Sequence, residues 1–107
     1  MNQNEETMLG AIIDLPYEEF KVKLEEQKVN IGIMNNIILS MESAYYELKL
    51  RKERILVLIF KGIRDREDPE VKKALEGLYA EMTKIELKVT YLKQRVGELL
   101  NVDKTPN

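Results

Sequence analysis

Residues 39–60 read LSMESAYYELKLRKERILVLIF, and the predicted architecture is built around them because they are apolar on two faces of one predicted helix. One face belongs to a seam whose positions alternate four and three residues apart. That spacing is the heptad of a left-handed coiled coil, in which each seam residue packs between four residues of a facing helix. The second face lies roughly opposite and carries Leu39, Tyr46, Leu50, Val57 and Phe60. A helix with two apolar faces is expected to need two partners.

The seam extends well beyond this stretch, and ten of its twelve positions are apolar. These positions are Phe20, Leu24, Gln27, Ile31, Met34, Ile38, Met41, Tyr45, Leu48, Lys52, Ile55 and Ile59. Pro16 fits the first turn of a helix, where its missing N–H costs nothing, so the sequence predicts one helix over residues 17–62. The two polar seam residues are Gln27 and Lys52. Each either fixes the register at a cost in stability or extends its polar end to solvent, and the second interpretation is favoured for Lys52.

A stop and a restart follow the long helix. Gly62 can adopt the left-handed conformation that closes a helix, Asp68 can cap the next one, and Pro69 fits its first position. Residues 63–68 are therefore predicted to form a turn, and residues 69–100 a second helix. All nine heptad positions of this second helix are apolar: Val71, Leu75, Leu78, Met82, Ile85, Val89, Leu92, Val96 and Leu99.

A connection this short sets the two helices antiparallel. The predicted fold is therefore all-α, an antiparallel helical hairpin resembling a coiled coil, with one long and one shorter helix that assemble into a helical bundle. Counting back from the turn places Tyr45 opposite Ile85.

The unequal lengths leave the start of the first helix uncovered by the second. Two arrangements would cover it. A bend near Gly32, which costs about 1 kcal/mol relative to alanine in a helix interior, would fold residues 17–30 back as a third helix. A straight overhang would instead pair with a second copy of the chain. The interface of that overhang would contain Phe20, Leu24 and Gln27.

Both ends of the chain are predicted to be flexible, because chain ends are commonly poorly ordered. Residues 1–15 form a predicted arm that starts polar and then carries a short apolar patch, and residues 101–107 form a polar tail. The alternative for the arm is a docking segment that lies in a groove of its own or a neighbouring chain.

The sequence contains neither histidine nor cysteine. Histidine is the commonest general base and zinc ligand, and cysteine supplies thiolate nucleophiles and disulfides. We therefore expect no catalytic residue, no cofactor, no metal site and no enzymatic activity. The first residues lack the basic and apolar regions of a signal peptide, and the longest unbroken apolar run, residues 55–60, is far shorter than a membrane span. A cytoplasmic protein without a membrane span is expected.

Charge is unevenly distributed, although the formal net charge is only -2. Residues 1–48 carry 3 basic and 9 acidic side chains, whereas residues 49–66 carry 7 basic and 2 acidic ones. The basic contact patch that this distribution predicts consists of Lys49, Arg51, Arg54, Lys61, Arg64 and Arg66. The overall negative charge argues against nucleic acid as the partner. The favoured use is complementarity between the basic middle of one chain and the acidic first third of another.

These patterns favour a non-enzymatic protein that self-associates, as a dimer or higher oligomer, or that binds a protein partner. Its predicted role is a structural, scaffolding or adaptor component of a larger complex, and a phage or viral assembly factor would have this build. The predicted interface is the second apolar face of the first helix. The alternative is a small regulatory binder whose basic helix-turn tip engages nucleic acid or an acidic protein surface.

Overall fold

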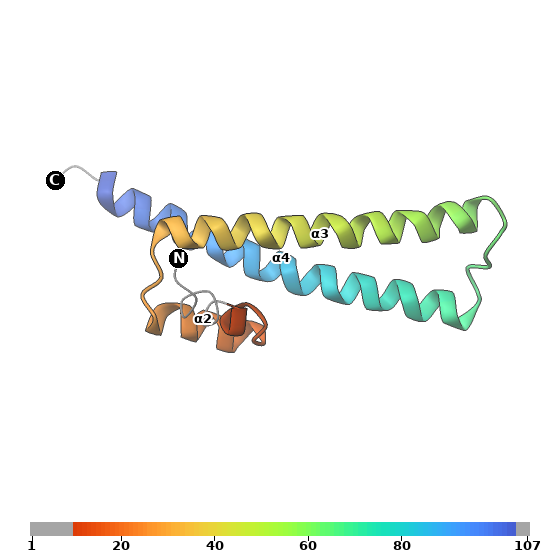
Figure 1. Cartoon of the computed structure of the whole chain (residues 1–107), viewed down its shortest axis with the longest axis horizontal. Helices are drawn as coiled ribbons and strands as arrows, with labels where there is room; N and C mark the ends of the chain where they lie inside the picture. Colours follow the sequence, from red (N-terminus) through yellow and green to blue (C-terminus); the bar gives the residue numbers. More distant parts are fainter. Residues whose placement is uncertain (1–9, 105–107) are drawn as a thin grey trace. The chain divides into compact units, whose positions relative to one another are not determined.

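The computed structural model describes residues 10–104, with side chains described as far as Asn101. The helices within this described range include α2 (Tyr17–Glu26), α3 (Ile31–Phe60) and α4 (Pro69–Lys104), which Figure 1 labels. Residues 10–13 are also helical, and no residue in the described range forms a strand. The two long helices pack against each other. The prediction of an all-α helical hairpin is therefore confirmed.

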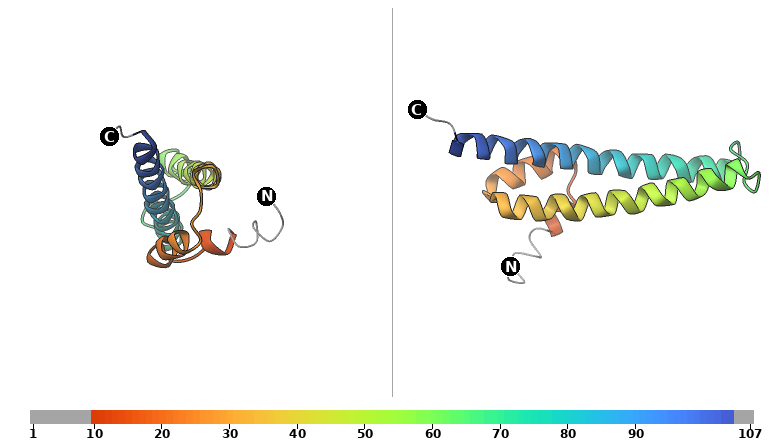
Figure 2. Two further views of the ribbon diagram at one scale, coloured as in Figure 1. Left: turned by 90° about the vertical axis from the view of Figure 1, so that its left-hand side faces the viewer. Right: turned by 90° about the horizontal axis from the view of Figure 1, so that it is seen from above.

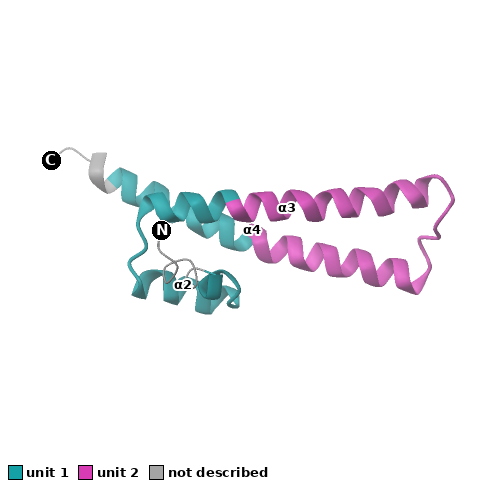
Figure 3. Cartoon of the chain, viewed as in Figure 1, with its two compact units in different colours: residues 1–39, 87–107 teal, residues 40–86 magenta. Residues whose placement is uncertain are grey.

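The chain divides into two compact units, coloured separately in Figure 3. Unit 1 combines the chain up to Leu39 with the chain from Leu87 onward, and unit 2 is Ser40–Glu86. Each long helix contributes a segment to both units.

Unit 2 is a two-helix hairpin, formed by the second part of α3 and the first part of α4, which run antiparallel (Figures 1 and 2). Met41, Val71 and Met82 are its buried apolar side chains. The Tyr45 hydroxyl donates a hydrogen bond to Glu86 Oε1 at 2.7 Å, which agrees with the register expected from the turn. Lys52 is half-buried in the seam, and its ammonium lies 5.6 Å from the ring centroid of Tyr79.

The connection between α3 and α4 closes one helix and opens the next with local hydrogen bonds. Gly62 adopts φ 76°, and the N–H groups of Gly62 and Ile63 donate to the carbonyls of Ile59 and Leu58. This pattern is the Schellman motif, which satisfies the last carbonyls of a helix. Asp68 Oδ1 then accepts a hydrogen bond from the N–H of Glu70 at 2.9 Å and so caps α4. The predicted stop and restart are found, with the helices ending and beginning at Phe60 and Pro69.

The prediction of one continuous helix over residues 17–62 is wrong. The helix is interrupted over residues 27–30, where Lys28 adopts the left-handed conformation with φ 51°. Asn30 ends the interruption, because its Oδ1 accepts a hydrogen bond from the N–H of Ile33 at 2.9 Å and caps α3. Gln27 is the exposed C-cap residue of α2 and therefore does not fix a buried register. This part of the chain agrees with the alternative prediction, in which residues 17–30 form a third helix.

Unit 1 contains α2 and the adjoining parts of α3 and α4, and Figure 2 shows these elements from two further sides. Its buried apolar side chains are Ile12, Phe20, Leu24, Val29, Met34, Ile37, Ile38 and Leu92. Phe20 and Leu24 are 0% and 2% exposed, so the predicted overhang interface is wrong. The chain itself covers both side chains.

The ends are also more ordered than predicted, so far as the described residues extend. Ile12 is buried, and Lys88 Nζ donates a hydrogen bond to the carbonyl of Ile13, so residues 10–15 are not a flexible arm. They fit the alternative of a segment docked on its own chain. At the other end α4 continues to Lys104, past the predicted limit at residue 100. The predictions for residues 1–9 and 105–107 lie outside the described residues.

Candidate interaction surface

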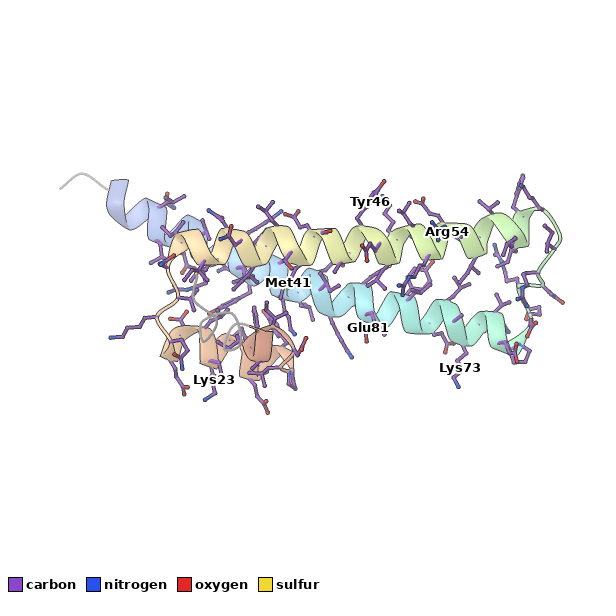
Figure 4. All side chains as sticks on the ribbon, in the orientation of Figure 1. Lys23, Met41, Tyr46, Arg54, Lys73 and Glu81 are labelled. Carbon is purple, nitrogen blue, oxygen red and sulfur yellow. The ribbon has the colours of Figure 1, made fainter. Side chains whose placement is uncertain are left out.

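Four apolar residues of unit 2 form a row on α3, on the side opposite the seam. We call this row the outer stripe, and it consists of Tyr46, Leu50, Val57 and Phe60. Phe60 is 92% exposed, Tyr46 59% and Val57 48%, whereas Leu50 is half-buried. Figure 4 shows that the Tyr46 side chain projects from α3 away from α4. The fifth residue predicted for this face, Leu39, is exposed as well but belongs to unit 1.

A hollow of about 520 Å³ lies beside the C-terminal end of the outer stripe. Its lining is apolar except for one acidic and one basic side chain, and consists of Glu53, Leu56, Val57, Ile59, Phe60 and Arg66. The sequence pattern gave no reason to single out Leu56 or Glu53. The signal that could have found the hollow is the spacing of four residues as i, i+3, i+4 and i+7, namely Glu53, Leu56, Val57 and Phe60.

The six predicted basic contact residues are all exposed, but they do not form one uniform basic surface. Arg51 and Arg54 line a hollow of about 900 Å³ between α3 and α4 in unit 2, together with the acidic side chains of Glu70 and Glu81. Arg66 lines the hollow beside the outer stripe. Lys49 is exposed on α3, and Lys61 directly follows this helix. Arg64, in the connection, lines a smaller hollow of about 240 Å³ together with Glu70. A basic contact patch stays a prediction.

Unit 1 contains a polar cluster that joins α2 to α4. The Tyr91 hydroxyl donates to Glu25 Oε1 at 2.8 Å, and Arg95 Nη2 donates to Glu25 Oε2 at 3.3 Å. Arg95 Nε lies 2.8 Å from Glu25 Oε1 in an ionic contact, and its Nη1 donates to Glu98 Oε2 at 2.6 Å. The cluster explains how a helix of ten residues is held in place, and it requires no ligand.

Two tyrosines have raised pKa values, Tyr91 in this cluster and Tyr45 in unit 2. Burial, followed by the hydrogen bond to Glu25, raises the pKa of Tyr91 to about 12. The hydrogen bond to Glu86 raises the pKa of Tyr45 in unit 2. In both cases the carboxylate stabilises the protonated phenol, so neither hydroxyl is activated as a base or nucleophile.

A third hollow, of about 590 Å³, lies in unit 1 where α2 gives way to α3. Its lining comes from the interruption, the start of α3 and the last part of α4, and consists of Leu24, Glu25, Lys28, Val29, Asn30, Ile31, Gly32, Met34, Arg95 and Leu99. Sequence reasoning missed it, because the hollow exists only where the helix is interrupted.

Among the side chains of residues 10–101, no three acidic groups are placed in a way that would hold a metal ion. None of the helices described has the length and apolarity needed to cross a lipid bilayer. Comparison of the chain with protein-family models, with curated proteins and with solved structures found no match. The surface of unit 2 is therefore the main guide to function.

Proposed function

We propose that this protein is a non-enzymatic helical component that self-associates through the outer stripe and acts as a structural, scaffolding or adaptor part of a larger complex. The observation that supports the proposal is the exposure of Phe60, Tyr46 and Val57 along one face of one helix. Monomeric proteins rarely expose contiguous apolar patches of more than a few hundred Å², and larger ones usually mark binding surfaces.

Burial of the outer stripe would supply the driving force for association. A side chain such as Phe or Val contributes about 1.5–3 kcal/mol when it moves fully from water into an apolar contact. Phe60 has nearly all of its surface still to bury, and Val57 about half. Aromatic residues at the centre of an interface also carry a large share of binding energy in other proteins.

The composition supports a role in binding and assembly rather than catalysis. Residues 1–107 include no histidine and no cysteine, and the tyrosines with shifted pKa values are held in their protonated form. Exposed carboxylates and ammonium groups on helices are ordinary solvated side chains.

A matched pair of valine substitutions tests the proposal. Val57 and Val22 are 48% and 56% exposed, both on helices, but only Val57 belongs to the outer stripe. Val57→Asp should weaken self-association, measured by light-scattering mass across a concentration series, whereas Val22→Asp should leave it unchanged. Circular dichroism checks that both variants stay helical.

The proposal is overturned if the mass of the unmodified protein stays at that of one chain from micromolar to millimolar concentration. It is also overturned if the two aspartate variants weaken association equally, because the surface that associates would then lie elsewhere.

A further inference from the structure

We infer that the outer stripe binds the outer stripe of a second copy with the two α3 helices antiparallel, so that Tyr46 of each copy fills the hollow beside Val57 and Phe60 of the other. This inference rests on the proposed self-association and specifies its geometry. Three observations carry it: the shape of the hollow, the position of Tyr46, and the charges beside the stripe.

The hollow has the arrangement that accepts a side chain from a facing helix. In a coiled coil each inserted residue packs between four residues of its partner helix, spaced as i, i+3, i+4 and i+7. Four of the residues that line the hollow have this spacing: Glu53, Leu56, Val57 and Phe60. The outer stripe therefore already carries one complete acceptor site on the surface of the described chain.

Tyr46 is the side chain on the same stripe that suits this site. It is 59% exposed and projects away from α4 (Figure 4). Tyrosine has an apolar ring and a polar tip, and a buried hydroxyl usually finds a hydrogen-bond partner. The hollow offers apolar walls together with the polar groups of Glu53 and Arg66.

A single two-fold axis lets both copies make the same contact with each other. If Tyr46 of one copy faces Val57 of the other, the axis crosses α3 between Arg51 and Lys52, and each copy inserts its tyrosine into the hollow of its partner. Such an isologous contact is the usual form of a symmetric dimer. Leu50 then lies close to the axis, where it faces Glu53 of the second copy, and Lys49 is within reach of that carboxylate.

The charges beside the stripe favour the antiparallel direction. Glu47 and Arg54 are exposed, lie one heptad apart on the same flank, and have no hydrogen bond or ion pair with other described residues. Antiparallel pairing about this axis brings Glu47 of each copy beside Arg54 of the other. Parallel pairing would bring Glu42 beside Glu47 and Lys49 beside Arg54, and like charges at flanking positions oppose association.

Charge reversal distinguishes the two directions. Glu47→Arg and Arg54→Glu, made singly in the full chain, should each weaken the dimer by roughly 10-fold at low salt, because two exposed pairs become repulsive and each pair is individually weak. Both changes in one chain should restore the affinity. An equal mixture of the two single variants should also restore it, since each chain then offers the charge that the other lacks.

Sedimentation equilibrium of the single variants, the double variant and the mixture provides the measurement, with circular dichroism to check helicity. The inference is wrong if the unmodified protein self-associates but the single variants bind as tightly or more tightly, which parallel pairing predicts. It is also wrong if neither the double variant nor the mixture recovers affinity. In both cases the proposed self-association stands. If the unmodified protein does not self-associate at any concentration, the proposed function fails and the inference fails with it.

Discussion

Replacing Phe20 with alanine tests whether α2 belongs to the core of unit 1. The Phe20 side chain has no exposed surface. Its ring centroid lies 6.3 Å from the ring centroid of Tyr91 and 5.2 Å from the ammonium of Lys88. Truncating a buried phenylalanine typically costs about 3–5 kcal/mol, which includes the lost transfer free energy and the cavity left behind. Phe20 and Leu24 are the two buried residues of α2. We therefore expect Phe20→Ala to remove most of the free energy that holds α2 against α4.

Hydrogen exchange of backbone amides, combined with denaturant unfolding, measures this loss. Protection of residues 17–26 should fall to that of a locally open helix, while residues 40–86 stay protected, because parts of a protein can open independently. Val22→Ala is the matched control. Val22 is 56% exposed on the same helix, so its truncation should change the free energy of unfolding by less than about 0.5 kcal/mol.

Two results would contradict the placement of Phe20 in the core of unit 1. One is an unchanged free energy of unfolding in Phe20→Ala. The other is an effect confined to self-association, with protection of residues 17–26 unaffected. The first result would mean that Phe20 is not buried in unit 1, and the second that it packs against another copy, as an overhang would.

Two further predictions concern a pair of glycines and one tyrosine. Gly62→Ala should lower the free energy of unfolding by about 1–2 kcal/mol, because Gly62 has the left-handed conformation with φ 76°. Gly77→Ala should raise the free energy of unfolding by about 0.5–1 kcal/mol, because Gly77 lies inside α4 and an added Cβ meets nothing within 4 Å. Denaturant midpoints measure both, and shifts in the same direction would contradict the argument. The pKa of Tyr91 is raised from 10.0 to about 12, so the folded state keeps a proton that the unfolded chain loses, and the stability present below pH 10 is lost as the pH rises through 12. In Tyr91→Phe this decline should be smaller, and an unchanged pH dependence would show that other groups cause it.

The hairpin could be predicted from the sequence because its signals are local and repeated. All nine heptad positions of the second helix are buried or half-buried in the structure. Gly62, Asp68 and Pro69 perform the closing and capping functions that their residue types suggest. Each of these features depends on neighbours a few residues away, so no knowledge of distant contacts was needed.

The heptad spacing alone does not show the interruption at residues 27–30, because it passes through the interruption unchanged, and only the alternative of a bend near Gly32 placed a break in this region. Leu24, Gln27 and Ile31 keep the four-and-three alternation although the chain between them is not helical. What breaks the helix is the cap formed by Asn30, together with the burial of α2 against a distant part of α4. Asparagine is common at helix starts, but its presence alone does not distinguish a cap from a solvated helix residue.

The difference between the two units is the strongest reason to place the interface in unit 2. In unit 1, which contains a third helix and the segment before it, eight apolar side chains of the described chain are buried, including Ile37. In the described residues of unit 2 only three are buried, and five large apolar side chains are exposed: Tyr46, Val57, Phe60, Ile63 and Tyr79. Two helices can bury one stripe each, and a third element is needed to cover another. Because no described element of unit 2 covers the outer stripe, the cover that we propose must come from outside the unit, and a second α3 has the complementary side chain and charges.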